Sequence, residues 1–374
     1  MNLEIRSLFP AASKYTYLNS AAVSPIPTTA IAAVTSQLND VSLNGSNNFN
    51  DWVATKNRAR VLVAQMLGAQ PEQIAFMRNT SDGFASVANG LTWTNTDNIV
   101  SFEQEFPANF YPWRMVRDRF SVELRLCKEI DGRIDIDEMT AMIDSNTKLV
   151  TISAVQFASG FKADLERIGR AARNADALFA VDIIQGLGAT GFDLPAQFVD
   201  VAAGASHKWL CAPEGCGILY MSDRARARVE PSFVGWISVE TPWDFGDRTQ
   251  PFKPNALAME SGTGAASLFY GLEQSLKLLH ETGLEKIEAY LEKLTDELCG
   301  LLSEKAYDIV SSRAKGEKSA IVCIRQRGGM DCNKIAERLQ NENIIVSPRN
   351  DRLRIAPHFY NNVEDIINLL AALP

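Results

Sequence analysis

The chain contains 374 residues and carries a formal net charge of −8, with an ordinary share of hydrophobic and charged residues. This length supports two or three structural units with a sizeable core. The negative charge and the lack of a basic cluster argue against nucleic acid or an anionic membrane as a partner. No apolar stretch is long enough to span a bilayer, and residues 1–6 lack the apolar core of a signal peptide.

Six cysteines are scattered along the chain, and none forms a CxxC pair or lies at metal-ligand spacing from a histidine. We therefore predict no metal site. Free thiols are typical of a reducing compartment, so we expect a cytoplasmic protein. The six are Cys127, Cys211, Cys216, Cys299, Cys323 and Cys332.

The first chemically suggestive segment is Arg78 to Phe84, where Thr80 and Ser81 open a predicted helix over residues 82–91. Hydroxyls and free backbone N–H groups at a helix start can bind an anion, although an ordinary N-cap uses the same residues. A strand is predicted over residues 99–102, and Phe106 lies in the loop that follows. This ring could stack on a flat heteroaromatic ligand or pack on the core.

The middle of the chain alternates apolar strands with helices. Strands are predicted over residues 148–155, 179–182 and 217–221, with a helix over 165–172. Near-continuous apolar strands separated by helices indicate an α/β fold with a mostly parallel sheet covered on both faces. Ligands of such sheets bind beyond the carboxyl ends of the strands.

Two residues at strand ends suggest a cofactor. Asp182 ends the strand 179–182, and Lys208 follows the next short apolar stretch. A lysine can form a Schiff base with pyridoxal phosphate (PLP), and a buried carboxylate can hold the pyridine nitrogen protonated. Gln185 could donate to the ring oxygen, and Ser206 and His207 to the phosphate. Alternatively, Lys208 is a surface lysine and Asp182 caps the next turn.

A remote alternative is an NAD-dependent oxidoreductase, because Gly186 to Gly191 fits the pattern GxGxxG. A dinucleotide fingerprint also requires a helix that begins at the glycines. The sequence that follows, from Phe192 to Pro195, predicts no such helix. We expect these glycines to form a turn instead.

The second half of the chain predicts a smaller α+β domain. Residues 239–254 read as a long loop, followed by helices over 264–280 and 284–302. Strands are predicted over residues 320–324, 344–346 and 352–355. We predict a large domain over residues 20–255, and a small domain formed by residues 1–19 with 256–374.

Together these residues resemble the fold-type I PLP-dependent transferases, specifically the class V aminotransferase group. This group includes cysteine desulfurases, selenocysteine lyases, isopenicillin N epimerases and kynureninases. The resemblance extends from the segment Tyr17 to Ala22 to the segment Arg354 to Pro357. It implies a large domain on a mostly parallel sheet, a smaller α+β C-terminal domain, and PLP as the cofactor.

The resemblance also implies roles for individual residues. Lys208 is similar to the Schiff-base lysine, Asp182 to the partner of the pyridine nitrogen, and Arg354 to the arginine that binds the substrate carboxylate. Asn19 is a candidate for the substrate pocket. The residues implied to bind the cofactor are Thr80, Ser81, Phe106, Asp182, Gln185, Ser206, His207, Lys208, Trp236 and Thr263. Thr263 and, more weakly, Trp236 match residues that reach the neighbouring subunit's site, which implies a homodimer.

The departures from the group concern the reaction. Desulfurases carry a catalytic cysteine shortly before the carboxylate-binding arginine, but residues 346–353 contain none. The resemblance implies an enzyme that acts at Cα of an amino acid, and we expect an aminotransferase. The alternative is an epimerase or a lyase of the same fold, similar to kynureninase, selenocysteine lyase or desulfurase. The substrate stays open.

Overall fold

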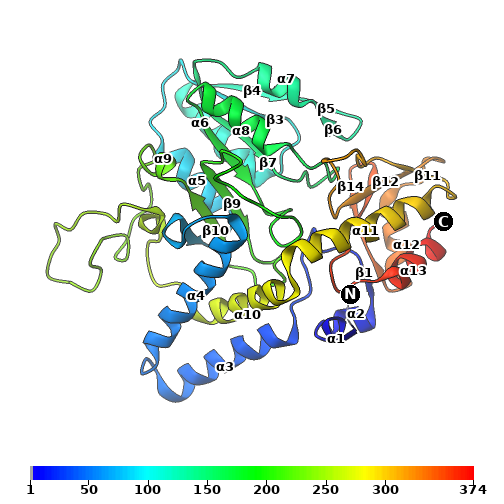
Figure 1. Cartoon of the computed structure of the whole chain (residues 1–374), viewed down its shortest axis with the longest axis horizontal. Helices are drawn as coiled ribbons and strands as arrows, with labels where there is room; N and C mark the ends of the chain where they lie inside the picture. The colour runs from blue at the N-terminus through cyan, green and yellow to red at the C-terminus, as the bar shows by residue number, and fades with distance from the viewer. Residues whose placement is uncertain (1–2) are drawn as a thin grey trace.

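The computed structural model describes residues 3–374. A large α/β unit and a smaller α+β unit lie side by side, and the long helix α11 (Leu284–Leu302) runs toward the smaller one (Figure 1). Within residues 3–374, no helix combines the length and the apolar character needed to cross a membrane.

The large sheet has seven strands, and only β10 runs against the others. The mostly parallel α/β sheet predicted from the sequence is therefore confirmed. In spatial order the strands are β2 (Ile74–Met77), β10 (Gly217–Met221), β9 (Val201–Ala205), β8 (Leu178–Asp182), β7 (Thr147–Ser153), β3 (Asn98–Phe102) and β4 (Glu123–Cys127).

Both faces of this sheet are covered because successive strand residues point to opposite sides. In β8, Leu178 packs with one core cluster, whereas Phe179 packs with the other. One face contacts helices α5 (Thr80–Gly90) and α6 (Tyr111–Phe120), and the other contacts α4 (Phe49–Leu67), α8 (Leu165–Asn174) and α10 (Ala266–Thr282). A strand buried on both faces reads as a continuous apolar run, which is why these strands were predictable.

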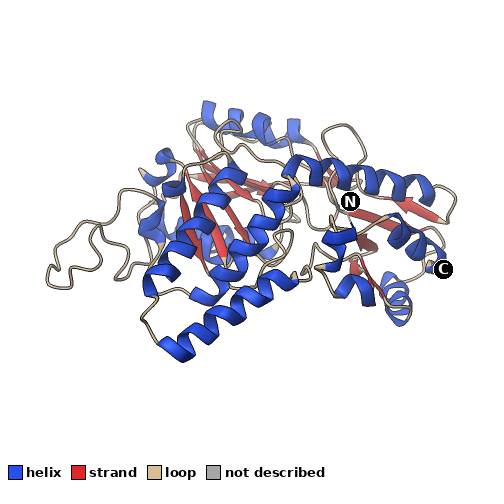
Figure 2. Cartoon of the chain, turned by 60° about the horizontal axis from the view of Figure 1, so that its bottom comes forward, coloured by secondary structure: helices blue, strands red, loops and turns tan. Residues whose placement is uncertain are grey.

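Helix α3 (Thr28–Asn44) and helix α4 were not predicted from the sequence. Helix α3 packs with α10 at the edge of the large unit (Figure 2). Its buried residues include Ala30 and Gln37, while Leu38 and Leu43 are 55% and 82% exposed. The buried face is thus small or polar and the exposed face partly apolar, so the usual amphipathic pattern is absent.

The smaller unit is built on an antiparallel sheet in the order β11 (Tyr307–Ile309), β12 (Val322–Gln326), β15 (Arg352–Ile355), β14 (Ser347–Arg349). Helices α11, α12 (Cys332–Asn341) and α13 (Val363–Ala372) contribute to its core. Strand β1 (Thr16–Tyr17) pairs in parallel with β13 (Ile344–Ile345), which ties the N-terminal segment to this unit. The domain bounds given above stay a prediction.

The remaining elements are short. They are α1 (Leu3–Ser7), α2 (Ala11–Lys14), α7 (Ile136–Ala141), α9 (Asp223–Arg226), β5 (Glu129–Ile130), β6 (Arg133–Ile134) and three 3-10 turns at Pro71–Gln73, Pro107–Asn109 and Ala256–Met259. The predicted loop over residues 239–254 contains no helix or strand and projects from the large unit (Figure 1).

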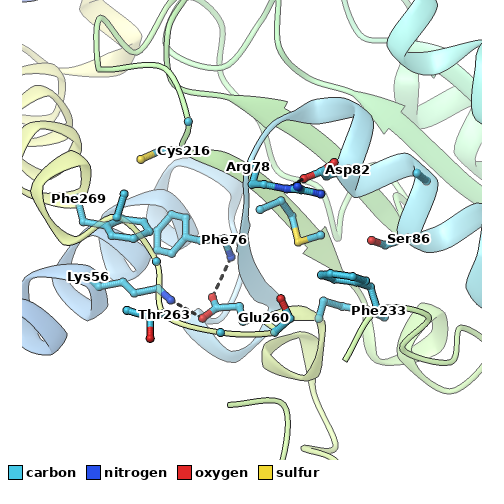
Figure 3. Close-up of a pocket in the computed structure, with 18 of the residues that line it drawn as sticks. Lys56, Phe76, Arg78, Asp82, Ser86, Cys216, Phe233, Glu260, Thr263 and Phe269 are labelled. Carbon is cyan, nitrogen blue, oxygen red and sulfur yellow. Dashed lines mark hydrogen bonds and ion pairs between the residues drawn. The ribbon is translucent and has the colours of Figure 1, made fainter. Parts of the chain in front are cut away.

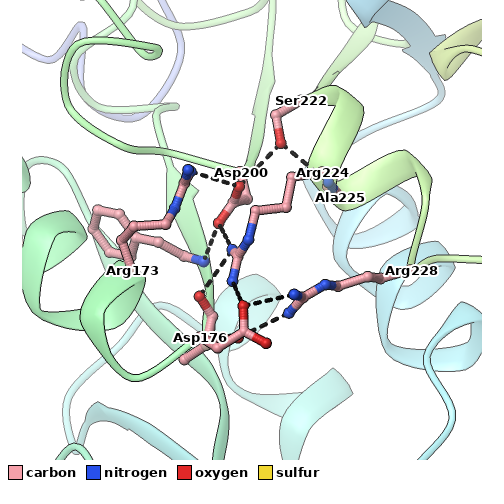
Figure 4. Close-up of polar contacts among 9 residues, drawn as sticks. Arg173, Asp176, Asp200, Ser222, Arg224, Ala225 and Arg228 are labelled. Carbon is pink, nitrogen blue, oxygen red and sulfur yellow. Dashed lines mark hydrogen bonds and ion pairs between the residues drawn. The ribbon is translucent and has the colours of Figure 1, made fainter.

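A polar network fixes the end of the large sheet opposite to the carboxyl ends of its strands. Asp200 immediately precedes β9, is buried, and pairs with Arg173 at 3.2 Å and Arg224 at 2.6 Å (Figure 4). It also accepts hydrogen bonds from the backbone of Phe179 and the hydroxyl of Ser222. Because the buried carboxylate is fully used by protein donors, we interpret this network as structural.

Candidate active site

Asp182 provides a buried carboxylate at the carboxyl end of the large sheet. It is the last residue of β8 and lies between Ser153 of β7 and Ala203 of β9. One oxygen, Oδ1, accepts a hydrogen bond from the backbone of Ile184 at 2.9 Å, but the buried Oδ2 has no partner. Burial raises the pKa of Asp182 to about 7. An orphaned carboxylate oxygen of this kind suits a cationic ligand atom.

Lys208 lies beside this carboxylate, three residues beyond the end of β9. Its side chain is buried, and burial lowers its pKa to about 8. Asp182 opposes this shift, whereas Arg354 adds to it. A lysine with a lowered pKa supplies the neutral amine that attack on a carbonyl carbon requires.

Phe106 covers the lysine. Its ring centroid lies 5.2 Å from Lys208 Nζ, and its edge packs against Phe157 at 5.2 Å between centroids. The ring is 38% exposed although it sits in a loop next to buried strands. One aromatic face therefore remains available to a flat ligand above the sheet.

Thr80 begins helix α5, two residues earlier than the sequence predicted for the helix start. Asn79 caps the helix by accepting a hydrogen bond from the backbone of Asp82, so Thr80 is not needed as the cap. Thr80 Oγ1 is buried and has no partner, whereas Ser81 is exposed. A free buried hydroxyl at the start of an eleven-residue helix suits a phosphate.

These four residues fit PLP. The unpartnered carboxylate oxygen of Asp182 suits a protonated pyridine nitrogen, and Lys208, whose pKa is lowered, suits the aldehyde. The ring of Phe106 suits the flat ring of the cofactor, and the free hydroxyl of Thr80 suits its phosphate. The fit rests on Asp182, Lys208, Phe106 and Thr80, which belong to four different segments of the chain.

Arg354 provides the cation predicted for the substrate carboxylate. It lies in β15, is almost fully buried, and donates one hydrogen bond from Nη1 to the carbonyl of Phe157 at 3.0 Å. Its Nε and Nη2 atoms have no partner, and burial lowers its pKa to about 9. The other pocket candidate, Asn19, accepts a hydrogen bond from the Ser347 hydroxyl at 2.7 Å and bridges to Ala356.

Two predicted cofactor ligands, Gln185 and Ser206, are already engaged by the protein. The side chain of Gln185 donates to the carbonyl of Ala21 and accepts from the indole of Trp209, both at 3.0 Å. Ser206 donates to the carbonyl of Pro213. His207 is half-buried, and burial and Lys208 lower its pKa. The cofactor contacts expected of these residues stay predictions.

Thr263 and Trp236 are both exposed in the single chain. Thr263 lines a cavity of about 830 Å³ that extends to the first turns of α5 and to Ser86 and Phe233 (Figure 3). Neither Lys208 nor Asp182 lines this cavity. Glu260 anchors the segment that carries Thr263 by pairing with Lys56 at 2.6 Å (Figure 3).

Glu105 is a site residue that sequence reasoning missed. Its buried carboxyl accepts from the backbone of Ser153 at 2.7 Å and from the amide of Gln156 at 2.8 Å, and it also contacts the Ser153 hydroxyl. Burial raises its pKa, and Glu105 in turn helps to raise the pKa of Asp182. Only its place directly before Phe106 could have indicated this role.

Comparisons with known proteins agree with this site. The family model described as aminotransferase class V matches residues 16–348. A probable cysteine desulfurase of Methanothermobacter thermautotrophicus is 27% identical, over 97% of this chain and 95% of that relative. The uncharacterized aminotransferase YcbU of Bacillus subtilis is 24% identical, over 97% of this chain and 95% of that relative.

Solved structures share the fold. A cysteine desulfurase of Thermococcus onnurineus NA1 superposes with a TM-score of 0.89 at 23% identity, covering 98% of this chain and 96% of that chain. The cystine C-S lyase C-DES, solved with its product cysteine persulfide, gives a TM-score of 0.89 at 23% identity, with 97% and 98% covered.

The chain therefore belongs to the class V aminotransferase family and is a PLP-dependent enzyme. The resemblance inferred from the sequence is confirmed. The names of the relatives favour the lyase alternative over transamination. The dinucleotide alternative finds no support, because Gly186 to Gly191 form turns and no helix begins there.

Proposed function

We propose that this enzyme is a PLP-dependent lyase that cleaves the Cβ–S bond of a cysteine-like amino acid. The main support is that the candidate site residues fit PLP and include no cysteine, while the relatives include cysteine desulfurases and the fold is that of a cystine C-S lyase. We infer that sulfur leaves as a free thiol or persulfide and is never carried on the protein.

The cysteines support release of sulfur into solution. Burial raises the pKa of Cys323, the one closest to Arg354 in the sheet, to about 11, and that of Cys211 to about 12. Cys332 begins α12, and its thiol donates to the carbonyl of Asn350. Only a thiolate accepts sulfur efficiently, and these thiols stay protonated at neutral pH.

Three side chains have separate roles in the proposed reaction. Arg354 holds the substrate carboxylate through its free Nε and Nη2 donors. Lys208, once displaced by the substrate amine, removes the proton from Cα as a general base. Asp182 keeps the proton on the pyridine nitrogen, and bound PLP supplies the sink for the Cα electron pair.

The proposed elimination needs no external oxidant. The Cα proton goes to Lys208, the electron pair of the Cα–H bond forms a Cα=Cβ bond, and the Cβ–S pair leaves with sulfur as a thiolate. Water then converts the released 2-aminoacrylate to pyruvate and ammonium. Phe106 covers Lys208, so bulk water has limited access to the amine before sulfur leaves.

We also propose a homodimer in which Thr263, and Trp236 with it, completes the partner's phosphate site. Both residues are exposed in the single chain, and Thr263 lines the large cavity. Trp236 packs edge to face with Trp243 at 5.0 Å, and Phe233 is 64% exposed. A cluster of exposed aromatic rings is typical of a protein–protein interface.

The decisive experiment incubates purified enzyme with L-cystine, L-cysteine and S-methyl-L-cysteine without an oxo acid. We expect pyruvate and ammonium in equal amounts, together with cysteine persulfide from L-cystine, hydrogen sulfide from L-cysteine and methanethiol from S-methyl-L-cysteine. Lys208→Ala should abolish the products, whereas Cys332→Ser should leave the rate within about twofold. Conversion of the cofactor to pyridoxamine, with an oxo acid required for each further turnover, would instead establish transamination.

A further inference from the structure

Three arginines share one face of the small sheet. Strands β14 and β15 pair antiparallel, with Arg349 opposite Arg352 and Ser347 opposite Arg354. Opposed residues point to the same side of a sheet, as do residues two apart in a strand. The guanidinium groups of Arg349, Arg352 and Arg354 therefore extend from a common face, and this face carries the arginine assigned to the substrate carboxylate.

Only one of the three is neutralised by the protein. Arg352 forms a buried ion pair with Glu129 and a second pair with Asp351 at 3.4 Å. Within residues 3–374, neither Arg349 nor Arg354 has a carboxylate partner. Arg349 Nη1 donates only to the adjacent carbonyl of Pro348, at 2.7 Å. The chain thus pairs the middle cation and leaves both of its neighbours unpaired.

Burying unpaired charges is unfavourable unless a ligand supplies the counter-charge. Burial lowers the pKa of Arg349 and that of Arg354, and the charge of Arg349 lowers the Arg354 pKa further. Both arginines also lower the pKa of Lys208, so both positive charges act on the reacting amine. One α-carboxylate neutralises one guanidinium, which leaves a second cation on the same face of the small sheet.

We propose that Arg349 binds a second anionic group at the end of the substrate side chain, so that the enzyme prefers acidic amino acids. This inference rests on the proposed function for the position of the α-carboxylate at Arg354. The chemical class is an amino acid whose side chain ends in a carboxylate, sulfinate or sulfonate. A planar guanidinium suits each of these oxyanions because its donors match two oxygens at once.

The test compares matched pairs of ligands that differ in side-chain charge: L-aspartate with L-asparagine, L-glutamate with L-glutamine, and S-sulfo-L-cysteine with S-methyl-L-cysteine. Binding to the PLP-loaded enzyme is followed by the change in its visible spectrum and by calorimetry. We expect the acidic member of at least one pair to bind about tenfold tighter or better. Arg349→Gln should remove this preference and change the Kd of the neutral member less than about threefold.

Two further variants provide controls. Arg354→Gln should weaken the acidic and neutral members alike, because both carry the α-carboxylate. Arg325→Gln removes a half-exposed arginine that pairs with Asp351 at 2.6 Å, and it should leave the preference intact. Arg349→Lys keeps the charge without the planar fork and should retain part of the preference.

The inference is overturned if no pair shows an acidic preference in the wild type, or if Arg349→Gln weakens both members equally. Failure of the proposed function would look different. Enzyme that binds acidic amino acids selectively but releases no pyruvate would contradict the lyase proposal and support the role of Arg349. Calorimetry on protein without PLP measures the same charge preference when no visible band forms.

Discussion

Asp182 ends β8, Lys208 lies three residues beyond the end of the neighbouring parallel strand β9, and each shifts the pKa of the other. The carboxylate raises the pKa of the amine, while burial lowers it to about 8. The amine lowers the pKa of the carboxyl, while burial raises it to about 7. Burial therefore brings both pKa values close to neutral pH, and a general base with a pKa near the working pH is the most effective.

Asp182→Asn should shift the pH dependence of PLP capture. In the cofactor-free protein, removal of the carboxylate removes the interaction that raises the Lys208 pKa, so the neutral amine forms at lower pH. We expect the rate at which the visible band appears to rise roughly one pH unit lower than in the wild type. The variant should nevertheless turn over at least about 100-fold more slowly, because the pyridine nitrogen loses its partner. An unchanged pH profile would show that the two side chains do not interact.

Phe106 should contribute to cofactor affinity through its ring alone. Phe106→Ala removes the aromatic face above Lys208 and should weaken PLP binding about 3- to 10-fold, since aromatic pairs are worth about 0.5–1.5 kcal/mol beyond burial. Phe106→His keeps a flat ring and should lose less than about threefold. Equilibrium dialysis against PLP measures both values. Equal losses in the two variants would contradict a stacking role.

The sequence was most informative where strands are buried on both faces. Strand β8 is an apolar run that ends in a single charged residue, and Lys208 follows the apolar strand β9; burying either charge requires a partner. Asp182 and Lys208 were found in this way, whereas Arg354 was indicated by the family resemblance; the structure places Asp182 and Arg354 close enough to Lys208 to shift its pKa. Their catalytic roles stay predictions.

Other features depend on contacts between distant segments. Nothing local marks Gln185 as bonded to Ala21, 164 residues earlier, or Glu105 as the acceptor for Ser153. Helix α3 escaped prediction because its buried face is formed by alanine and polar residues. The sequence does not show which of the three arginines is paired, because Glu129, the partner of Arg352, lies 223 residues earlier in the chain.

Glu105→Gln should change how stability depends on pH. The unfolded carboxyl titrates near pH 4.5, and burial raises the pKa in the folded protein, so the folded state holds this proton more tightly. The free energy of unfolding therefore falls as pH rises from about 4.5 through the raised pKa, by about 1.4 kcal/mol for each pH unit that separates the unfolded and folded pKa values. The neutral amide does not titrate, so the Tm of the variant relative to the wild type should increase with pH.

Thermal unfolding between acidic and alkaline pH measures this difference. Glu123→Gln changes an exposed carboxylate on β4 and should give a nearly constant Tm difference over the same range. A Tm difference for Glu105→Gln that shrinks as pH rises would mean that Glu105 is stabilised as a carboxylate. Ser153 and Gln156 would then be donors to a permanent charge.

Gly188→Ala should displace the backbone segment that carries Lys208. Gly188 has φ +104°, and a Cβ there would lie 2.3 Å from the backbone oxygen of Trp209, the residue after the lysine. The strained backbone and the clash together should lower the free energy of unfolding by about 2–5 kcal/mol, and PLP affinity should fall with it.

Gly316→Ala is the matched control, because Gly316 has φ +87° and open space around its Cβ. We expect that control to cost about 1 kcal/mol and to leave PLP binding unchanged. If the two variants lose equal stability in chemical denaturation, backbone strain explains the whole effect, and the close approach of Gly188 to the lysine segment has no role in the site.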